Sequence, residues 1–148
     1  MEMLVLMGAP GAGKSTFLRE RFFDTHVRIN LDMLRTRHRE RALLDACLCT
    51  RQPVAIDNTN PTRAQRAVYL VRAREHGFAV YGYRFHAPLD VLRERNGLRS
   101  GKARVPDVAI LATLKAFEPP VFAEGFDRLF EVEPAPDGYR ITEVADEI

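Results

Sequence analysis

The 148-residue sequence contains no tryptophan, two cysteines and few lysines. Cys47 and Cys49 lie two positions apart, a spacing that matches neither a zinc-binding pair nor a redox Cys-x-x-Cys motif. We therefore expect reduced, structural thiols. The four histidines show no metal-ligand spacing either, so the sequence predicts no catalytic metal site built from histidine and cysteine.

Long apolar runs are also missing. No run approaches the roughly 20 residues that a membrane-spanning helix needs, and no basic segment precedes the first apolar run as it would in a signal peptide. Hydrophobic content of 46% and charged content of 28% are ordinary for a globular protein. We therefore expect a cytoplasmic protein that forms one domain over residues 1–148, with no membrane association and no obligate protein partner.

Positive charge is carried almost entirely by arginine, because only 3 of the 22 basic residues are lysine. Residues 1–116 hold 20 basic and 11 acidic residues, whereas residues 117–148 hold 2 and 9. A basic body suits a phosphate-rich ligand, and a nucleic-acid strand is one such ligand. The alternative is a coding bias toward arginine, which makes the position of each lysine more informative.

Residues 8–15 read Gly-x-x-x-x-Gly-Lys-Ser, directly after the apolar run 3–7 and before a helix-compatible segment. This is the strand–loop–helix context of a phosphate-binding loop, whose backbone N–H groups surround phosphate oxygens at the start of a helix. Lys14 would reach the β- and γ-phosphates, and the Ser15 hydroxyl would ligate Mg²⁺. The alternative, a glycine-rich turn before an ordinary helix, does not explain this context. The sequence therefore predicts binding of ATP or another NTP by Gly11, Ala12, Gly13, Lys14, Ser15 and Thr16.

Strand-like and helix-like segments alternate along the chain, which predicts an α/β fold with a parallel five-stranded sheet and helices on both faces. This is the architecture of nucleotide-kinase-like P-loop NTPases. The expected strands lie at 3–7, 27–30, 53–57, 78–85 and 128–132, and residues 139–144 could add an edge hairpin. The expected helices lie at 14–23, 31–51 (as one helix or as two pieces), 60–75, 89–95 and 106–117. Asn60 is the expected cap of the third of these.

Two acidic residues follow expected strands. Asp32 comes after the second strand, where the carboxyl ends of the strands collect ligands, so it is a candidate base that takes a proton from an attacking hydroxyl. The alternative is that Asp32 only caps the following helix. Arg35 would share its helix side and hold an anionic acceptor. Asp57 ends the third strand, where it would hold Mg²⁺ or its water, or form an ordinary turn.

A second basic group, including Arg95 and Arg99, leads into a glycine-flanked segment, and the expected lid covers about residues 96–105. Beside a phosphate-binding loop, this segment is expected to act as a cationic lid that closes over the triphosphate and excludes water. The alternative is a solvated basic turn.

Taken together, these motifs resemble the kinase domain of the 5′-hydroxyl polynucleotide kinases. The matching pieces include residues 8–18, 30–32 and 54–61, and later ones extend the resemblance to about residue 133. The resemblance implies Asp32 as general base and Lys14, Ser15, Arg95 and Arg99 as phosphate and metal handlers. It also implies acceptor contacts by Arg35, Asp57, Asn58 and Thr59.

The expected activity is transfer of the γ-phosphate of ATP or another NTP, with Mg²⁺, to the 5′-hydroxyl end of DNA or RNA. The sequence departs from the family pattern at Leu31, where arginine is frequent, and in the length of the lid. It also lacks the Asp-x-Asp-x-Thr motif of the phosphatase half, so no phosphatase domain is expected. The alternatives are a P-loop kinase for a nucleoside, sugar or antibiotic, and a nucleotide-binding switch without phosphotransfer.

Overall fold

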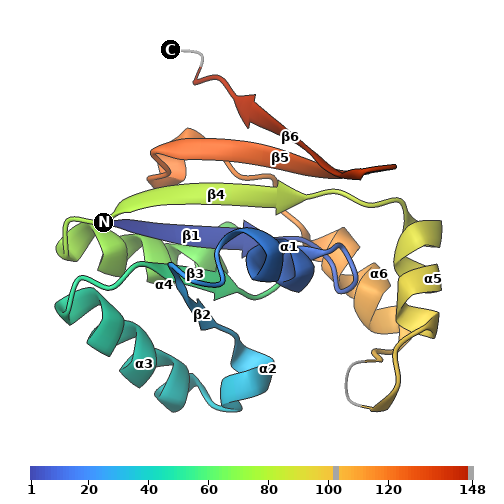
Figure 1. Cartoon of the computed structure of the whole chain (residues 1–148), viewed down its shortest axis with the longest axis horizontal. Coiled ribbons are helices and arrows are strands. Elements are labelled where there is room, and N and C mark those ends of the chain that lie inside the picture. Colours follow the sequence, from blue (N-terminus) through green and yellow to red (C-terminus); the bar gives the residue numbers. More distant parts are fainter. Residues whose placement is uncertain (102–103, 147–148) are drawn as a thin grey trace.

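A single sheet organises the computed structural model, which describes residues 1–101 and 104–146 (Figure 1). Its strands are β1 (Glu2–Met7), β2 (Val27–Ile29), β3 (Val54–Asp57), β4 (Ala79–Phe85), β5 (Arg128–Ala135) and β6 (Gly138–Val144). Their spatial order is β2-β3-β1-β4-β5-β6. Strands β1 to β5 are parallel, as predicted, and β6 pairs antiparallel with β5 as the expected edge hairpin. The sheet thus has a sixth strand, and β5 continues beyond the predicted end at residue 132.

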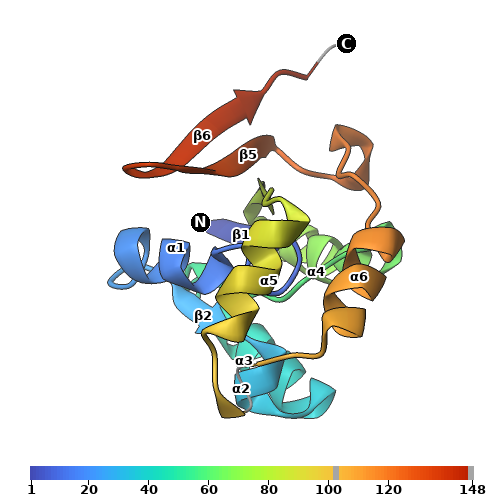
Figure 2. The ribbon, with the colours of Figure 1, turned by 90° about the vertical axis from the view of Figure 1, so that its right-hand side faces the viewer.

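Helices cover both faces of the sheet, as the alternation of elements predicts. They are α1 (Lys14–Arg21), α2 (Leu31–Leu34), α3 (Arg37–Cys49), α4 (Arg63–Glu75), α5 (Leu89–Gly97) and α6 (Asp107–Ala116), with a short 3₁₀ turn at Phe122–Glu124. Figure 2 shows α1 on one side of the sheet, α4 on the other, and α5 over the carboxyl ends of the strands.

Strand β1 is buried on both faces because it lies in the middle of the sheet. Alternate side chains enter two cores: Met3, Val5 and Met7 pack with α3 and α4, whereas Leu4 and Leu6 pack with α1 and α5. This continuous apolar run is typical of a central parallel strand. It anchors the loop that follows β1 from two sides.

The predicted start of α4 is wrong by two residues. Thr62, not Asn60, is the N-cap, and it forms a capping box with Gln65. Asn60 is buried with a positive φ of 44°, and its side-chain amide donates to the Leu6 carbonyl at 2.6 Å. A tertiary contact with β1 therefore takes the side chain that local sequence would use as a cap.

The predicted helix 31–51 is divided in two, as one reading of its sequence allowed. Helix α2 is a single turn, and Arg35 follows it with a φ of 76° before Thr36 caps α3. Within the described residues, the helices lack the length and apolar character required to span a bilayer.

Candidate active site

The loop between β1 and α1 has positive φ values, which favour glycine, at Gly8, Gly11 and Gly13. Gly8 has a φ of 150°, and a Cβ there would lie 2.9 Å from the carbonyl oxygen of Phe85. Gly13 has a φ of 102° and is the N-cap of α1. The Gly8 amide donates to the Thr59 carbonyl at 3.0 Å, which ties this loop to the loop after β3. The glycine pattern is therefore explained by the loop geometry, as the phosphate-binding motif predicts.

Lys14 begins α1 with its side chain folded back along the loop. Its Nζ donates to the carbonyls of Gly8 and Ala9, at 2.7 and 3.0 Å. Burial lowers the pKa of Lys14 from 10.5 to about 8; Asp57 opposes the shift, Arg99 adds to it, and Asp32 opposes it. Because this ammonium group is poorly hydrated, an anionic ligand beside it would stabilise its charged form.

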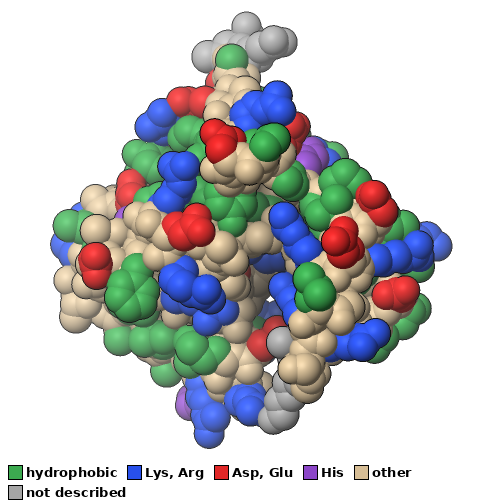
Figure 3. Space-filling view, turned by 45° about the vertical axis from the view of Figure 1, so that its right-hand side comes forward, with side chains coloured by type: hydrophobic (Ala, Val, Ile, Leu, Met, Phe, Trp, Pro, Cys, Tyr) green, Lys and Arg blue, Asp and Glu red, His purple; other side chains and the backbone are tan. Residues whose placement is uncertain are grey.

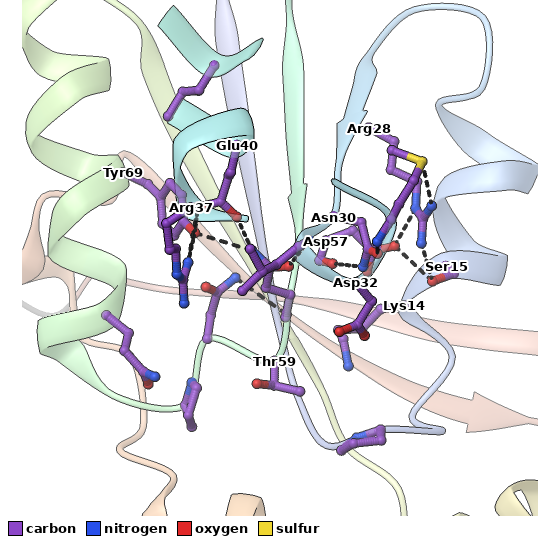
Figure 4. A pocket seen from close by; sticks show the side chains of 18 of the residues that line it. Lys14, Ser15, Arg28, Asn30, Asp32, Arg37, Glu40, Asp57, Thr59 and Tyr69 are labelled. Carbon is purple, nitrogen blue, oxygen red and sulfur yellow. Dashed lines mark hydrogen bonds and ion pairs between the residues drawn. The ribbon is translucent and has the colours of Figure 1, made fainter. Parts of the chain in front are cut away.

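Ser15, Asp57 and Arg28 form a closed triangle, here called the Arg28 cluster, at the start of α1 (Figure 4). The Ser15 hydroxyl donates to Asp57 Oδ2 at 2.8 Å. Arg28 donates from Nε to the same Oδ2 at 2.7 Å and from a terminal nitrogen to Ser15 Oγ at 3.3 Å. Asp57 is 2% exposed, whereas the Arg28 side chain is 39% exposed. A hydroxyl and a carboxylate at this distance are the hard oxygen ligands that suit Mg²⁺, so these residues fit the predicted metal site.

Asp32 is exposed in the first turn of α2 and lines the same cavity as Lys14. The alternative that Asp32 only caps this helix is wrong, because Asn30 is the cap and accepts from the Met33 amide at 2.9 Å. The Asn30 side chain also donates to the Asp57 carbonyl, at 2.6 Å. Asparagine therefore satisfies the backbone and leaves the carboxylate of Asp32 to face the cavity.

A buried polar network forms the wall of the cavity away from the phosphate loop. Glu40 accepts from Tyr69 at 2.8 Å, from Asn58 at 3.0 Å and from Arg37 at 3.0 Å. Asn58 also accepts from the Leu31 amide at 2.9 Å. Burial and the Glu40 carboxylate raise the pKa of Tyr69 to about 12, so its hydroxyl remains a donor. Asn58 is thus engaged in holding α2, α3 and α4 together.

The cavity that these groups enclose has a volume of about 1240 Å³. It runs from the phosphate loop past α2 to the groove between α3 and α4, and Thr59, Arg99 and Val105 also line it. Figure 3 shows a hollow at the centre of this face with lysine and arginine side chains beside it. The volume exceeds the roughly 300–1,000 Å³ of an ordinary small-molecule site, so there is room for two ligands side by side.

Not every predicted site residue meets this cavity. Arg99 lines it, but Arg95 lies behind the phosphate loop, donating to the Gly11 carbonyl at 3.0 Å and approaching Gly13. Arg35 is exposed and is not among the cavity-lining residues, since α2 ends before it and the expected helical spacing from Asp32 does not apply. Its contact with an acceptor stays a prediction. Of the predicted lid 96–105, residues 102 and 103 lie outside the described residues.

The ends of the described lid are joined by Asn96, which is buried and accepts from the Val105 amide at 2.8 Å. Beside Arg95, the Tyr139 ring of β6 also lies next to Gly13, and its hydroxyl donates to the Gly13 carbonyl at 3.4 Å. The C-terminal hairpin therefore supports the loop from outside the cavity.

Sequence reasoning missed Arg28, Glu40 and Tyr69. The position of Arg28 carried a usable signal, because it lies two residues before Asn30 and so shares its side of an extended strand. Glu40 and Tyr69 belong to helices that meet only in the folded protein, and no local pattern joins them.

Comparison with known proteins gives a family and a fold. Residues 3–120 match the family described as AAA domain. The chain is 31% identical over 135 residues to a protein of Acanthamoeba polyphaga mimivirus, and 29% identical over 136 residues to one of Schizosaccharomyces pombe; both are named as bifunctional polynucleotide phosphatase/kinases. The matches cover 86% and 88% of this chain but only 32% and 33% of the two relatives. The chain thus spans about a third of their length.

Among solved structures, a gluconokinase from Sinorhizobium meliloti 1021 superposes with a TM-score of 0.61 at 23% identity. The superposition covers 89% of this chain and 82% of the gluconokinase. At this identity the similarity shows a shared P-loop kinase fold and says nothing about the acceptor.

Proposed function

The chain belongs to the AAA domain family, and from this premise we propose that it is a kinase that transfers the γ-phosphate of ATP or another NTP to the 5′-hydroxyl of a nucleic-acid strand. The observation that carries the proposal is one cavity lined by both a buried lysine of a phosphate loop and an exposed carboxylate. Lys14 and Asp32 are these two groups. The relatives named as polynucleotide phosphatase/kinases support the choice of acceptor.

In the proposed reaction the loop amides and Lys14 bind the β- and γ-phosphates of the donor. The carboxylate of Asp32 orients the attacking hydroxyl and takes its proton as the bond to phosphorus forms. Arg99 lines the cavity near Lys14, where it neutralises charge that develops on the transferred group.

Ser15 and Asp57 would hold Mg²⁺, which supplies charge neutralisation between the β- and γ-phosphates when bound. Both oxygen atoms already lie 2.8 Å apart, and Asp57 is kept in place by its position at the buried end of β3. The two oxygen atoms are therefore already close enough to share one metal ion, once the Arg28 hydrogen bond to Asp57 Oδ2 is released.

The far end of the cavity supports a polymeric anion as acceptor. Arg37, His38 and Arg41 of α3 line it, together with Arg72 of α4. A strand whose 5′ end meets Asp32 would place its next phosphates in this basic groove. Arg37 also pairs with Glu40 and Arg72 with Asp45, but a basic lining of this extent exceeds what a sugar or nucleoside acceptor needs, and this supports the nucleic acid over the small molecule.

The assay is transfer of labelled phosphate from ATP to a 5′-hydroxyl oligonucleotide by the wild-type protein and by Asp32→Asn. We expect the variant to lose about 10²- to 10⁴-fold in kcat while its affinity for ADP is unchanged. Asp90→Asn is the matched control, because Asp90 is an exposed acid in the first turn of α5 that does not line the cavity. If Asp32→Asn transfers phosphate at the wild-type rate, the assignment of the base is wrong.

Acceptor choice is tested with a panel of oligonucleotides, nucleosides and sugars. The proposal requires that oligonucleotides give the highest kcat/KM and that their KM rises with salt. Faster phosphorylation of a sugar or nucleoside would identify a small-molecule kinase instead. No labelled product with any acceptor would identify a nucleotide-binding protein without phosphotransfer.

A further inference from the structure

The Arg28 cluster already contains a cation at the position where the proposed function requires a metal ion. Asp57 Oδ2 accepts from Ser15 Oγ and from Arg28 Nε, at 2.8 and 2.7 Å. A terminal nitrogen of the same guanidinium lies 3.3 Å from Ser15 Oγ. Arg28 therefore contacts both of the oxygen-bearing groups that would ligate Mg²⁺ (Figure 4).

This arrangement opposes the binding of a free divalent ion. A metal ion approaching Ser15 and Asp57 would displace a charge-assisted hydrogen bond and would face a like charge at close range. Lys14, also near Asp57, adds a second positive charge, and Arg99 near Lys14 adds a third, which the Asp32 carboxylate offsets only in part. Before nucleotide binds, the net charge around the two ligands is therefore unfavourable for a metal ion.

A nucleotide changes this balance, because its phosphates bring several negative charges to the phosphate loop. The Arg28 side chain is 39% exposed, and besides the cluster it contacts only the Met33 sulfur among its described hydrogen bonds, at 3.8 Å. It lines the same cavity as Lys14 of the phosphate loop, so a guanidinium released from Asp57 would face bound phosphate oxygens. Its release from Asp57 would then free the carboxylate at the moment when the metal ion is needed.

We propose that Arg28 is a resident cation that closes the Ser15–Asp57 site to free divalent metal and yields it when phosphates arrive. Metal binding and nucleotide binding are then coupled, and each strengthens the other by the same factor. The inference rests on the proposed use of a metal–nucleotide complex, but it is independent of the identity of the acceptor.

The test measures Mn²⁺ binding to the full chain by electron paramagnetic resonance, with and without ADP. For Arg28→Gln without nucleotide we expect an Mn²⁺ affinity at least about tenfold above that of wild type, since the competing charge is gone. With ADP present we expect the two proteins to differ by less than about threefold, because the phosphates have already displaced the guanidinium. Arg28→Lys, which keeps the charge, should bind free Mn²⁺ nearly as weakly as wild type.

Two controls assign the effect to this site. Arg140→Gln makes the same change in net charge on β6, at the opposite edge of the sheet from β2, and should leave Mn²⁺ binding unchanged. Asp57→Asn added to Arg28→Gln should abolish the gained affinity. Cooperative urea unfolding, which does not depend on either ligand, reports that each variant is folded.

The proposal is overturned if Arg28→Gln binds free Mn²⁺ no better than wild type, or if it weakens Mn²⁺ binding with and without ADP alike. The latter result would make Arg28 a positioning residue for the metal ligands. Failure of the proposed function is seen separately, as the absence of phosphate transfer to oligonucleotides, and it leaves the Mn²⁺ result standing.

Discussion

The protein contains one arginine–carboxylate pair in its interior and another at the cavity, and the two pairs differ in burial and in the number of their hydrogen-bond partners. Arg66 is fully buried and binds Glu124 through two hydrogen bonds of 2.9 and 3.1 Å. It also donates to the carbonyls of Asn60 and Glu118, at 3.0 and 2.9 Å. Arg28 is half-exposed, and among the described residues it is bound by Asp57 and Ser15 and, weakly, by the Met33 sulfur.

The two arginines differ in how many of their N–H groups donate to acceptors within the protein. Arg66 joins the start of α4 to the segment 118–124. Moving it would deprive two carbonyls of this donor and leave the buried Glu124 carboxylate with the Val121 amide but no cation. Arg28 faces the cavity, so a ligand can replace its contacts. A guanidinium surrounded by protein acceptors is structural, whereas one that borders a cavity is available for function.

The largest effect is expected at the interior pair. Arg66→Met should lower the free energy of unfolding by about 3–5 kcal/mol, because it leaves Glu124 buried without its partner. Urea unfolding measures this change. The double variant Arg66→Met with Glu124→Met is the matched control and should recover much of the loss. A single-variant loss below about 1 kcal/mol would contradict a structural role.

A second test examines the Glu40–Tyr69 hydrogen bond, which belongs to the buried polar network between the interior and the cavity. Tyr69→Phe removes the donor at 2.8 Å from Glu40 and should cost about 1–3 kcal/mol of unfolding free energy. Tyr83→Phe is the control for loss of a hydroxyl, because Tyr83 packs against Phe130 on the other side of the sheet with ring centroids 4.7 Å apart. Equal losses in the two variants, measured by urea unfolding, would argue against the network.

The third test concerns Lys14, which is buried like Arg66 but belongs to the cavity. Its pKa of about 8 means that the charged form is lost as pH rises past that value. Without divalent metal, ADP affinity measured by calorimetry should therefore fall by up to about tenfold per pH unit above 8. Lys14→Met should bind weakly with no such dependence. Constant wild-type affinity to pH 9.5 would contradict the lowered pKa.

The lowered pKa of Lys14 also predicts how the free energy of unfolding depends on pH. Between pH 8 and the unfolded-state pKa of 10.5 the unfolded chain holds a proton that the native protein has lost. The contribution of Lys14 to the free energy of unfolding should then increase with pH across this window. Urea unfolding of wild type and Lys14→Met at a series of pH values isolates this contribution.

The smallest effect is expected at the cavity pair. Arg28→Gln should change the free energy of unfolding by about 1 kcal/mol or less, since the side chain is half-exposed and glutamine keeps a donor. Urea unfolding beside Arg66→Met makes the comparison direct. If the two variants lose equal stability, the distinction between an interior and a cavity arginine fails.

Much of the fold followed from local pattern. The apolar run of β1, the glycines of the phosphate loop and the order of strands and helices predicted a parallel sheet with helices on both faces, and the structure confirms it. Errors arose where a distant contact competed with a local one. Asn60 has the side chain of a helix cap, yet the Leu6 carbonyl of β1 takes its amide.

In the candidate site, too, local pattern predicted the position of some residues and failed for others. Lys14, Ser15, Asp32 and Asp57 stand at loops that follow strands, and parallel pairing brings the ends of β1, β2 and β3 to one edge of the sheet. Arg35 was placed by an assumed helical spacing, and α2 ends one residue before it. The role of each of these residues stays a prediction.

By itself, the sequence determined the phosphate loop, because the conformations needed at Gly8 and Gly13 are accessible to glycine and costly for other residues. It also determined the layered fold through the alternation of apolar segments. Only the tertiary structure decided which charges meet. Arg28 reaches Asp57 across 29 positions of sequence and Tyr69 reaches Glu40 across the same separation, and such pairings depend on how strands and helices pack.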